Sequence, residues 1–406
     1  MLHLKLAWRN IWRNKRRTLI TIFSIFVAVV LSALSNSMQI GSYDQMIENV
    51  AGLYLGYAQV HQDGYWDDPQ LNNSFGDSDS LQQKIASVDE VTHVVPRIES
   101  YALAAGREQS RASLVIGMHP EKEKVLVDPQ QKLVKGDYFE SPSQRAALVS
   151  EGLADYLNLS VGDTLVILGQ GFRGMSAADK YPITGILDMG MPQMNKNTVY
   201  IPLHTAQELF GAYDRLTAYA LMVEDARSVE EVVTTVRSRL SDDYEVMSWQ
   251  TLMPELVQAI EADWASGMIM LLVLYMVVGF GIFGTILMMV AERQYELGVM
   301  MAIGTHKATL QIMMVLELLM ISIIGVIGGA IGSLPFIWYF HLNPIRLSGT
   351  AAEAVEQFGI EPIVPFSTDP QVLFIQAAII FGIAVIISLY PVVHIQRLQP
   401  VKAMQK

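Results

Sequence analysis

Apolar residues gather in four long runs, and these runs set the organisation of the chain. A helix needs about 20 apolar residues to cross the hydrocarbon core of a bilayer, which is about 30 Å thick. Every run is long enough, so we predict four transmembrane helices over residues 18–39, 266–290, 312–341 and 371–396. The hydrophobic content of 51% and the mean hydropathy of +0.30 also exceed those of an ordinary soluble protein.

The first run has a second interpretation, because residues 33–35 (Ala-Leu-Ser) resemble the cleavage site of a signal peptide. The run is longer than most signal-peptide cores, and residues 1–17 before it have the pattern of an amphipathic helix. One face of that helix holds Leu4, Ala7 or Trp8, Ile11 and Trp12. We therefore favour an uncleaved span preceded by a helix lying in the membrane interface, where it contacts lipid.

Charge placement predicts the orientation of the spans. Residues 1–17 contain six basic residues and no acid, and the tail 397–406 is also basic, whereas residues 40–265 contain 33 Asp and Glu against 16 Lys and Arg. By the positive-inside rule, both termini and residues 291–311 are cytoplasmic. Residues 40–265 and the loop 342–370 then lie outside, in a multi-pass protein of the inner membrane. The net charge of −12 comes from the external domain and gives no support to nucleic acid as a partner.

The external segment 40–265 mixes strand and helix patterns, which predicts an α+β domain inserted between the first and second spans. Strands are expected within 57–66, 91–98, 111–118, 146–150, 181–190, 197–203 and 218–225, and helices at 79–88, 205–211 and 228–242. Ser228 followed by Glu231 has the pattern of a capping box. We expect two lobes, divided near 100–110 and near 220, with one lobe built from both ends of the segment.

Motifs for catalysis are missing from the sequence. The absence of cysteine excludes disulfides, thiol nucleophiles and thiolate metal sites. None of the eight histidines has HExxH or zinc-knuckle spacing, and neither GxSxG nor a P-loop occurs. The glycine-rich stretch 169–174 is better explained by a hairpin loop than by a phosphate cradle. We expect no catalytic residue, no metal site and no cofactor bound by this chain.

The third span carries two features of its own. Glu317 is an acid within an apolar run, and such a residue normally has a functional or pairing role. Pairing with a basic residue such as Arg293, or contact with a partner protein, is favoured over a proton relay. Small residues four apart let helices approach closely, either to a second copy or to neighbouring spans of the same chain. They are Gly325, Gly328, Gly329 and Gly332.

The polar stretch between the second and third spans contains the most specific pattern, ERQYELGVMMAIG at 292–304. It resembles the ER-x-x-E-I-G-x-L-R-A-x-G segment of the FtsX/MacB/LolC–LolE type (type VII) ABC transporter permeases. The matching residues are Glu292, Arg293, Glu296, Gly298, Ala302 and Gly304, whereas Met301 stands where an Arg is usual. The segments LAWRNIWRNKRRTLIT and YPVVHIQRLQPVKAM are similar to the family's two ends. Length and the lack of a fused ATPase place the chain nearest to the LolC/LolE lipoprotein-releasing group.

The resemblance implies a MacB-like periplasmic core domain and a coupling helix within 291–311 that docks on a separate cytoplasmic ATPase, present in two copies. That ATPase would bind ATP and Mg. The implied coupling residues are Glu292, Arg293, Glu296, Gly298, Val299, Met301, Ala302 and Gly304. The chain would pair with a second copy or a paralogue and transmit ATP-driven motion to the periplasmic domain, a process called mechanotransmission. Its task would be lipoprotein release or export of an amphiphile, with a periplasmic adaptor as a further partner. The alternative is an FtsX-like signalling subunit that activates a cell-wall hydrolase.

Overall fold

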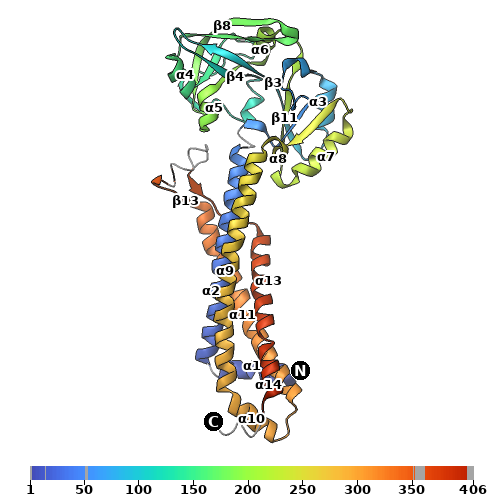
Figure 1. Ribbon diagram of the computed structural model, residues 1–406, viewed down its shortest axis with the longest axis vertical. Coiled ribbons are helices and arrows are strands. Elements are labelled where there is room, and N and C mark those ends of the chain that lie inside the picture. Colours follow the sequence, from blue (N-terminus) through green and yellow to red (C-terminus); the bar gives the residue numbers. More distant parts are fainter. Residues whose placement is uncertain (1, 14, 51–53, 351, 353–361, 400–406) are drawn as a thin grey trace. The chain divides into compact units, whose positions relative to one another are not determined.

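The structure is a computed structural model that describes residues 2–13, 15–50, 54–350, 352 and 362–399. The chain divides into two compact units, and Figure 1 labels many of their helices and strands. The membrane unit comprises residues 1–44, 259–346 and 363–406, and the sheet domain comprises residues 45–258 and 347–362. Two helices, α2 and α9, begin in one unit and end in the other.

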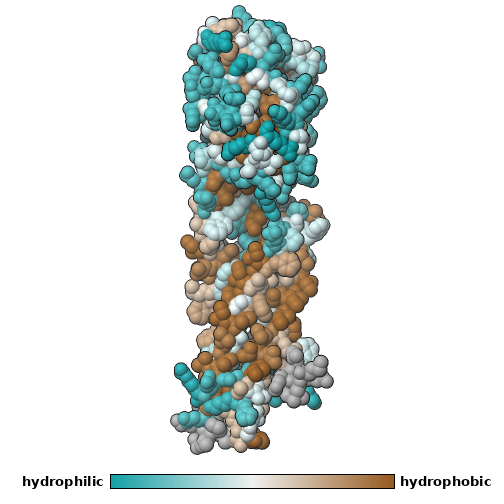
Figure 2. Space-filling view, turned by 90° about the vertical axis from the view of Figure 1, so that its right-hand side faces the viewer, coloured by the Kyte–Doolittle hydropathy of each residue, from teal (hydrophilic) through white to brown (hydrophobic). Residues whose placement is uncertain are grey.

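The membrane unit is helical. Its helices are α1 (Leu2–Arg13), α2 (Lys15–Val50), α9 (Pro254–Glu292), α10 (Gln294–Ala302), α11 (Lys307–Leu342), α13 (Pro370–Ile387) and α14 (Tyr390–Arg397). Four stretches are long and apolar enough to cross a membrane, and each contains one of the predicted spans: Thr18–Asn49, Pro254–Glu292, Lys307–Leu342 and Pro370–Arg397. Apolar side chains form a broad brown band over the surface of these helices (Figure 2). The four candidate membrane helices are therefore present.

The fourth span consists of two helices, which the hydrophobic pattern did not indicate. Helix α13 ends at Ile387, and α14 begins at Tyr390 with Pro391 in its first turn. A proline has no backbone N–H to donate, and its ring clashes with the carbonyl four residues earlier. For Pro391 that carbonyl belongs to Ile387, the residue at which α13 ends. The sequence also did not predict β13 (Ile345–Arg346) and β14 (Ile363–Val364), which form an antiparallel pair after α11.

The glycines of the third span pack against another helix of the same chain. A Cβ atom on Gly325 would lie 2.8 Å from the Cβ of Ile25, and one on Gly329 would lie 2.7 Å from the Cβ of Val29. Gly328 and Gly332 both face the ring of Phe26. Glycine thus allows α11 to approach α2 closely. The sequence left open whether these residues contact a second copy or a neighbouring span of the same chain, and in the structure they pack against a neighbouring span.

The amphipathic N-terminal segment forms α1, and α1 packs against the apolar core of the membrane unit. Ala7 and Ile11 are fully buried, and Ile11 joins the same apolar core as Ile25 and Ile321. Trp8 and Trp12 are 47% and 42% exposed. Their rings pack edge to face, with the ring centroids 5.9 Å apart. Of the two alternatives for the apolar face, Ala7 is the residue that is buried.

The sheet domain is built on one mixed sheet of ten strands. Its order is β12-β1-β11-β3-β4-β9-β6-β8-β5, with β7 pairing to β3 and β8. The strands are β1 (Ala58–Gln62), β3 (Val91–Ala105), β4 (Ser110–Met118), β5 (Leu133–Gly136), β6 (Ala147–Ser150), β7 (Thr164–Gln170), β8 (Ser176–Leu187), β9 (Thr198–Pro202), β11 (Ala218–Val223) and β12 (Tyr244–Ser248). Strands β2 (Phe75–Gly76) and β10 (Arg215–Leu216) form a separate pair. Its helices are α3 (Asp79–Ala86), α4 (Glu151–Leu157), α5 (Pro192–Asn197), α6 (Leu203–Phe210), α7 (Val229–Arg239) and α8 (Trp249–Leu252).

The predicted pairing of the two ends of this segment is visible in the sheet, because β1 lies between β11 and β12. The sheet is nevertheless continuous, since the 15-residue strand β3 pairs with β11 at one end and with β4 and β7 at the other. The glycine-rich stretch at 169–174 lies at the β7–β8 hairpin, as expected of a loop.

The capping box predicted at the start of α7 was wrong. A short 3-10 turn at Ala226–Ser228 precedes the helix, so Ser228 has φ −88° and ψ 0° instead of the extended backbone of a capping residue. Its hydroxyl donates to the carbonyl of Asp225 at 2.8 Å and makes no cap bond. The carboxylate of Asp225 accepts from the backbone N–H of Arg227 at 2.9 Å and caps the preceding turn instead.

Candidate coupling site

The segment 291–311 contains a short helix between two turns, not one continuous helix. Helix α9 ends at Glu292, α10 covers Gln294–Ala302 and α11 begins at Lys307. Gly304 has φ +100°, a backbone conformation that other residues adopt only with strain. The glycine that ends the sequence motif therefore permits the reversal of the chain between α10 and α11.

Arg293 lies at the junction of α9 and α10 and points inward. Only 6% of the residue is exposed, and its Nη1 donates to Oε2 of Glu317 at 2.5 Å. Its Nη2 also reaches the carbonyl of Asn10 in α1 at 3.5 Å. Glu317 itself is 1% exposed, so the pair is a buried ion pair. The predicted pairing of Glu317 with Arg293 is confirmed, and the pair joins the start of α10 to α1 and α11.

Glu296 forms a second ion pair, with Arg13 at the end of α1. The two side chains are 45% and 55% exposed, in contrast to the buried pair. Exposed ion pairs contribute about 0–1 kcal/mol to stability, because water screens the charges. Glu296 therefore remains accessible to another charged group.

Helix α10 has an inward and an outward face. Leu297 and Gly298 are buried, and Leu297 belongs to the apolar core of the membrane unit. Tyr295 is 57% exposed and Ile303, at the helix end, is 80% exposed. Positions 295, 299, 302 and 303 share one side of a helix because they follow three- and four-residue spacing. We call the exposed residues Tyr295, Glu296, Ala302 and Ile303, together with the partly exposed Val299, the α10 surface.

The start of α11 is fixed to the end of α14. The Nζ of Lys307 donates to the carbonyls of Gln396 at 2.9 Å and Leu398 at 3.0 Å. Gln311 donates to the carbonyl of Val392 at 2.8 Å. A lysine at the end of a helix satisfies carbonyls that have no partner within the helix and interacts favourably with the helix dipole. The turn after α10 is thus held to the last helix of the chain.

The structure separates the predicted coupling residues into two groups. Glu296, Val299 and Ala302 belong to the α10 surface, and Glu292 is exposed at the end of α9. Arg293 and Gly298 are buried, Met301 packs partly against the core, and Gly304 shapes the turn. Tyr295 was not singled out, because it occupies a variable position of the motif. The signal that could have identified it is its aromatic ring among the polar residues 292–296, because aromatic side chains are common at the centre of protein interfaces.

Two family models match the chain. The model described as FtsX-like permease C-terminal matches residues 268–400, which include α10, and the MacB-like periplasmic core domain matches residues 18–239. The chain belongs to the FtsX/MacB family of ABC transporter permeases. The resemblance drawn from the motif at 292–304 is confirmed, and so is the fold class of four candidate membrane helices with an inserted MacB-like domain.

Two relatives of this FtsX-like permease share 18–25% of its residues over most of the chain. It is 18% identical to the lipoprotein-releasing system transmembrane protein LolC of Neisseria meningitidis, over 97% of this chain and 95% of LolC. It is 25% identical to the pyoverdine export ATP-binding/permease protein PvdT of Pseudomonas aeruginosa, over 80% of this chain but only 49% of PvdT. The periplasmic region of MacB from Actinobacillus actinomycetemcomitans matches 52% of this chain and 97% of its own, at 13% identity and a TM-score of 0.36.

Proposed function

We propose that this permease is the transmembrane subunit that transmits ATP-driven motion from a separate cytoplasmic ATPase to the sheet domain outside the membrane. The observation that carries the proposal is the α10 surface. The nine-residue helix α10 exposes a tyrosine and a glutamate, and the isoleucine that caps its end is 80% exposed. The other face of α10 packs into the apolar core of the membrane unit. Exposed apolar and aromatic side chains on a rigid support are typical of a docking site for another protein.

Charge supports the cytoplasmic placement of this surface. The basic α1 and Arg397 at the end of α14 lie in the same unit as α10, and α1 contacts α10 through the ion pair of Arg13 with Glu296. By the positive-inside rule, these basic segments lie on the cytoplasmic side of the inner membrane. The acidic sheet domain is then external, and both termini are cytoplasmic.

The expected partners follow from this arrangement and from the relatives. A permease of this family works with an ATPase. In PvdT, whose name is ATP-binding/permease protein, the two functions are named for a single chain. We expect two copies of the ATPase, which hold ATP and Mg, and a second permease subunit. For the cargo, the relatives favour lipoprotein release or export of an amphiphile, since LolC is named for the first and PvdT for the export of pyoverdine.

Docking is tested by recovering the ATPase with tagged permease from detergent extracts. Ile303→Asp and Tyr295→Asp place a charge on the α10 surface, whereas Tyr213→Asp makes the same change at a 65% exposed tyrosine of the sheet domain. The α10 variants should lose ATPase by more than tenfold, because removing a central contact costs about 2 kcal/mol or more. The Tyr213 variant should retain it.

Equal recovery in all three variants would contradict docking at α10. Insertion and folding are checked in parallel by limited trypsin digestion of the sheet domain, which should give the same fragments throughout. A cell-wall hydrolase that co-purifies with the permease, with no effect of the cargo on ATP hydrolysis, would favour the signalling alternative.

A further inference from the structure

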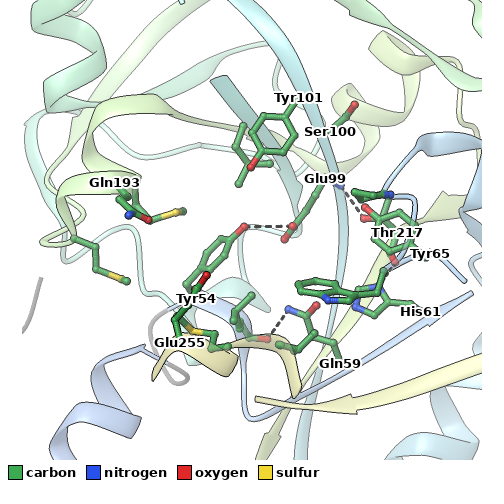
Figure 3. Close-up of a pocket in the computed structure, with 18 residues that line it drawn as sticks. Tyr54, Gln59, His61, Tyr65, Glu99, Ser100, Tyr101, Gln193, Thr217 and Glu255 are labelled. Atoms are coloured by element: carbon green, nitrogen blue, oxygen red, sulfur yellow. Dashed lines mark hydrogen bonds between the residues drawn. The ribbon is translucent and has the colours of Figure 1, made fainter. Parts of the chain in front are cut away.

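A cavity of about 440 Å³ lies within the sheet domain. It is lined from β1, β3, α5 and the start of α9, together with the residues just before and after β1 (Figure 3). Pockets that bind small molecules are commonly about 300–1,000 Å³. The cavity is therefore large enough for an organic ligand, and nothing in the coupling mechanism uses it.

Aromatic rings form much of the cavity wall. They belong to Tyr54, Tyr65, Trp66 and Tyr101, and three methionine side chains join them. Figure 3 shows Tyr54 beside the Glu99 carboxylate, joined to it by a hydrogen bond, and Tyr101 above it in the view. Aromatic faces attract cations through their quadrupole, and flexible methionines adapt to ligands of different shape. This lining suits an apolar or aromatic ligand.

Charge at the wall of the cavity is negative and incompletely balanced. Arg97 is fully buried and donates to Glu123 through both Nε, at 3.2 Å, and Nη2. Glu99 is the second acid beside the same guanidinium, with Oε1 at 3.5 Å from Nη1 and Oε2 at 3.4 Å from the Tyr54 hydroxyl. One cation thus stands between two carboxylates, of which Glu99 is the one that lines the cavity. A buried charge without a full partner is costly, so this site favours an added cation.

The other titratable groups of the lining do not supply that cation. Among the described residues that line the cavity, none is Lys or Arg, and Glu255 adds a second acid. His61 donates from Nδ1 to the carbonyl of Thr217 at 2.7 Å, and burial lowers the pKa of His61 to about 4. The imidazole is therefore neutral near pH 7, and its Nε2 is an acceptor with no hydrogen-bond partner among the described residues.

From the aromatic lining, the unbalanced Glu99 and the lack of lining cations, we propose that this cavity binds an organic cation with an apolar or aromatic body. The positive group lies at Glu99, and the body lies against Tyr54, Trp66 and Tyr101. Binding itself depends only on the cavity. The further step, that cargo contacts the external domain at this cavity, rests on the proposed function.

Two ions of nearly the same size and shape but opposite charge test the proposal: tetraphenylphosphonium and tetraphenylborate. Equilibrium dialysis with the full chain in detergent, without ATPase, measures the affinity for each. The Glu99→Gln variant removes the charge while keeping the shape, and Glu108→Gln neutralises an exposed acid that does not line the cavity. Comparing variants removes the contribution of the micelle, which takes up each ion equally in all samples.

The unchanged chain should bind the phosphonium saturably and about tenfold or more tightly than the borate. Glu99→Gln should abolish that preference, Glu108→Gln should keep it, and Tyr101→Leu, at a 66% exposed position, should weaken phosphonium binding without affecting folding. Burial raises the pKa of the Glu99 carboxyl, while Arg97 opposes the shift. Lowering the pH through this raised pKa protonates Glu99 and should weaken phosphonium binding in the unchanged chain but not in Glu99→Gln.

Equal affinity for the two ions, unchanged phosphonium binding in Glu99→Gln, or no saturable binding by the unchanged chain would each overturn the proposal. These outcomes are independent of the docking test. The dialysis contains no ATPase, so failure of the cavity proposal leaves ATPase recovery as expected, and failure of docking at α10 leaves phosphonium binding as expected.

Discussion

Two ion pairs near α10 differ in burial, and the difference predicts different roles for their residues. The Arg293–Glu317 pair is buried, whereas the Arg13–Glu296 pair is about half exposed. Water solvates the charges of the exposed pair when its partner is removed, but it cannot reach those of the buried pair. The charge of a residue therefore does not by itself reveal whether the side chain contacts a partner protein or the core.

Arg293→Ala should destabilise the membrane unit strongly, because it leaves the Glu317 carboxylate buried without this partner. Breaking a buried pair costs about 3–5 kcal/mol. The matched variant Arg13→Ala should cost about 0–1 kcal/mol. Thermal unfolding of the purified chain in detergent compares the two, and similar losses in both variants would mean that the buried pair is not what holds α10 in place.

Glu296 can be tested for a direct contact with the ATPase by exchanging charges. Glu296→Lys should weaken ATPase recovery by well over tenfold, since reversing a charged interface contact costs about 2–5 kcal/mol. The double variant Arg13→Glu/Glu296→Lys restores the ion pair within the chain but keeps the wrong charge on the α10 surface. Recovery of the ATPase by the double variant would show that Glu296 acts only through Arg13.

At the scale of elements, helix packing assigns the glycines of α11 to the fold. Gly329 faces Val29 and the backbone of Phe26 in α2, whereas Gly284 in α9 has no atom within 4 Å of where a Cβ would lie. Gly329→Leu should therefore separate α2 from α11 and cost about 1–3 kcal/mol. Gly284→Leu should be neutral or slightly stabilising, because glycine is a poor helix former. Thermal unfolding measures both, and equal stability of the two variants would contradict close packing of α11 on α2.

Periodicity predicted those elements whose burial pattern is regular. The four apolar runs and the buried strands at 111–118, 146–150 and 197–203 all correspond to elements of the structure. Strand β5 was missed because its residues are mostly exposed and show no alternation. The break before Pro391 was missed because the apolar pattern continues across it, although a proline in a helix was itself the physical signal.

The sequence predicted which segment contains the candidate site, but not which of its side chains form the exposed surface. The motif at 292–304 located α10, and the intramembrane acid located the partner of Arg293. Which side chains face outward depends on how α10 packs through Leu297 against the apolar core of the membrane unit, and that packing is a tertiary feature without a sequence signature. The cavity beside Glu99 could not be predicted for the same reason, since its walls come from residues 54–255 of the sheet domain.

At the scale of the whole molecule, we propose that α2 and α9, which extend from one unit into the other, carry motion outward. Helix α9 runs unbroken from Pro254 in the sheet domain to Glu292, next to α10. A helix with all its backbone hydrogen bonds transmits a displacement along its axis, and a proline in its interior interrupts it. Ala262→Pro should therefore uncouple the sheet domain from α10 without touching the docking surface, whereas Ala262→Leu should not.

The most direct measurement is single-molecule FRET between dyes on Tyr213→Cys in the sheet domain and Phe374→Cys in α13 of the membrane unit, both at exposed positions and neither on α9. The chain contains no cysteine of its own, so the two dyes attach only where intended. In membranes, with the co-purified ATPase bound, adding ATP should shift the FRET efficiency, and the shift should shrink in Ala262→Pro while ATP hydrolysis continues. An unchanged efficiency on adding ATP, or the same shift in Ala262→Pro, would contradict transmission through the helix.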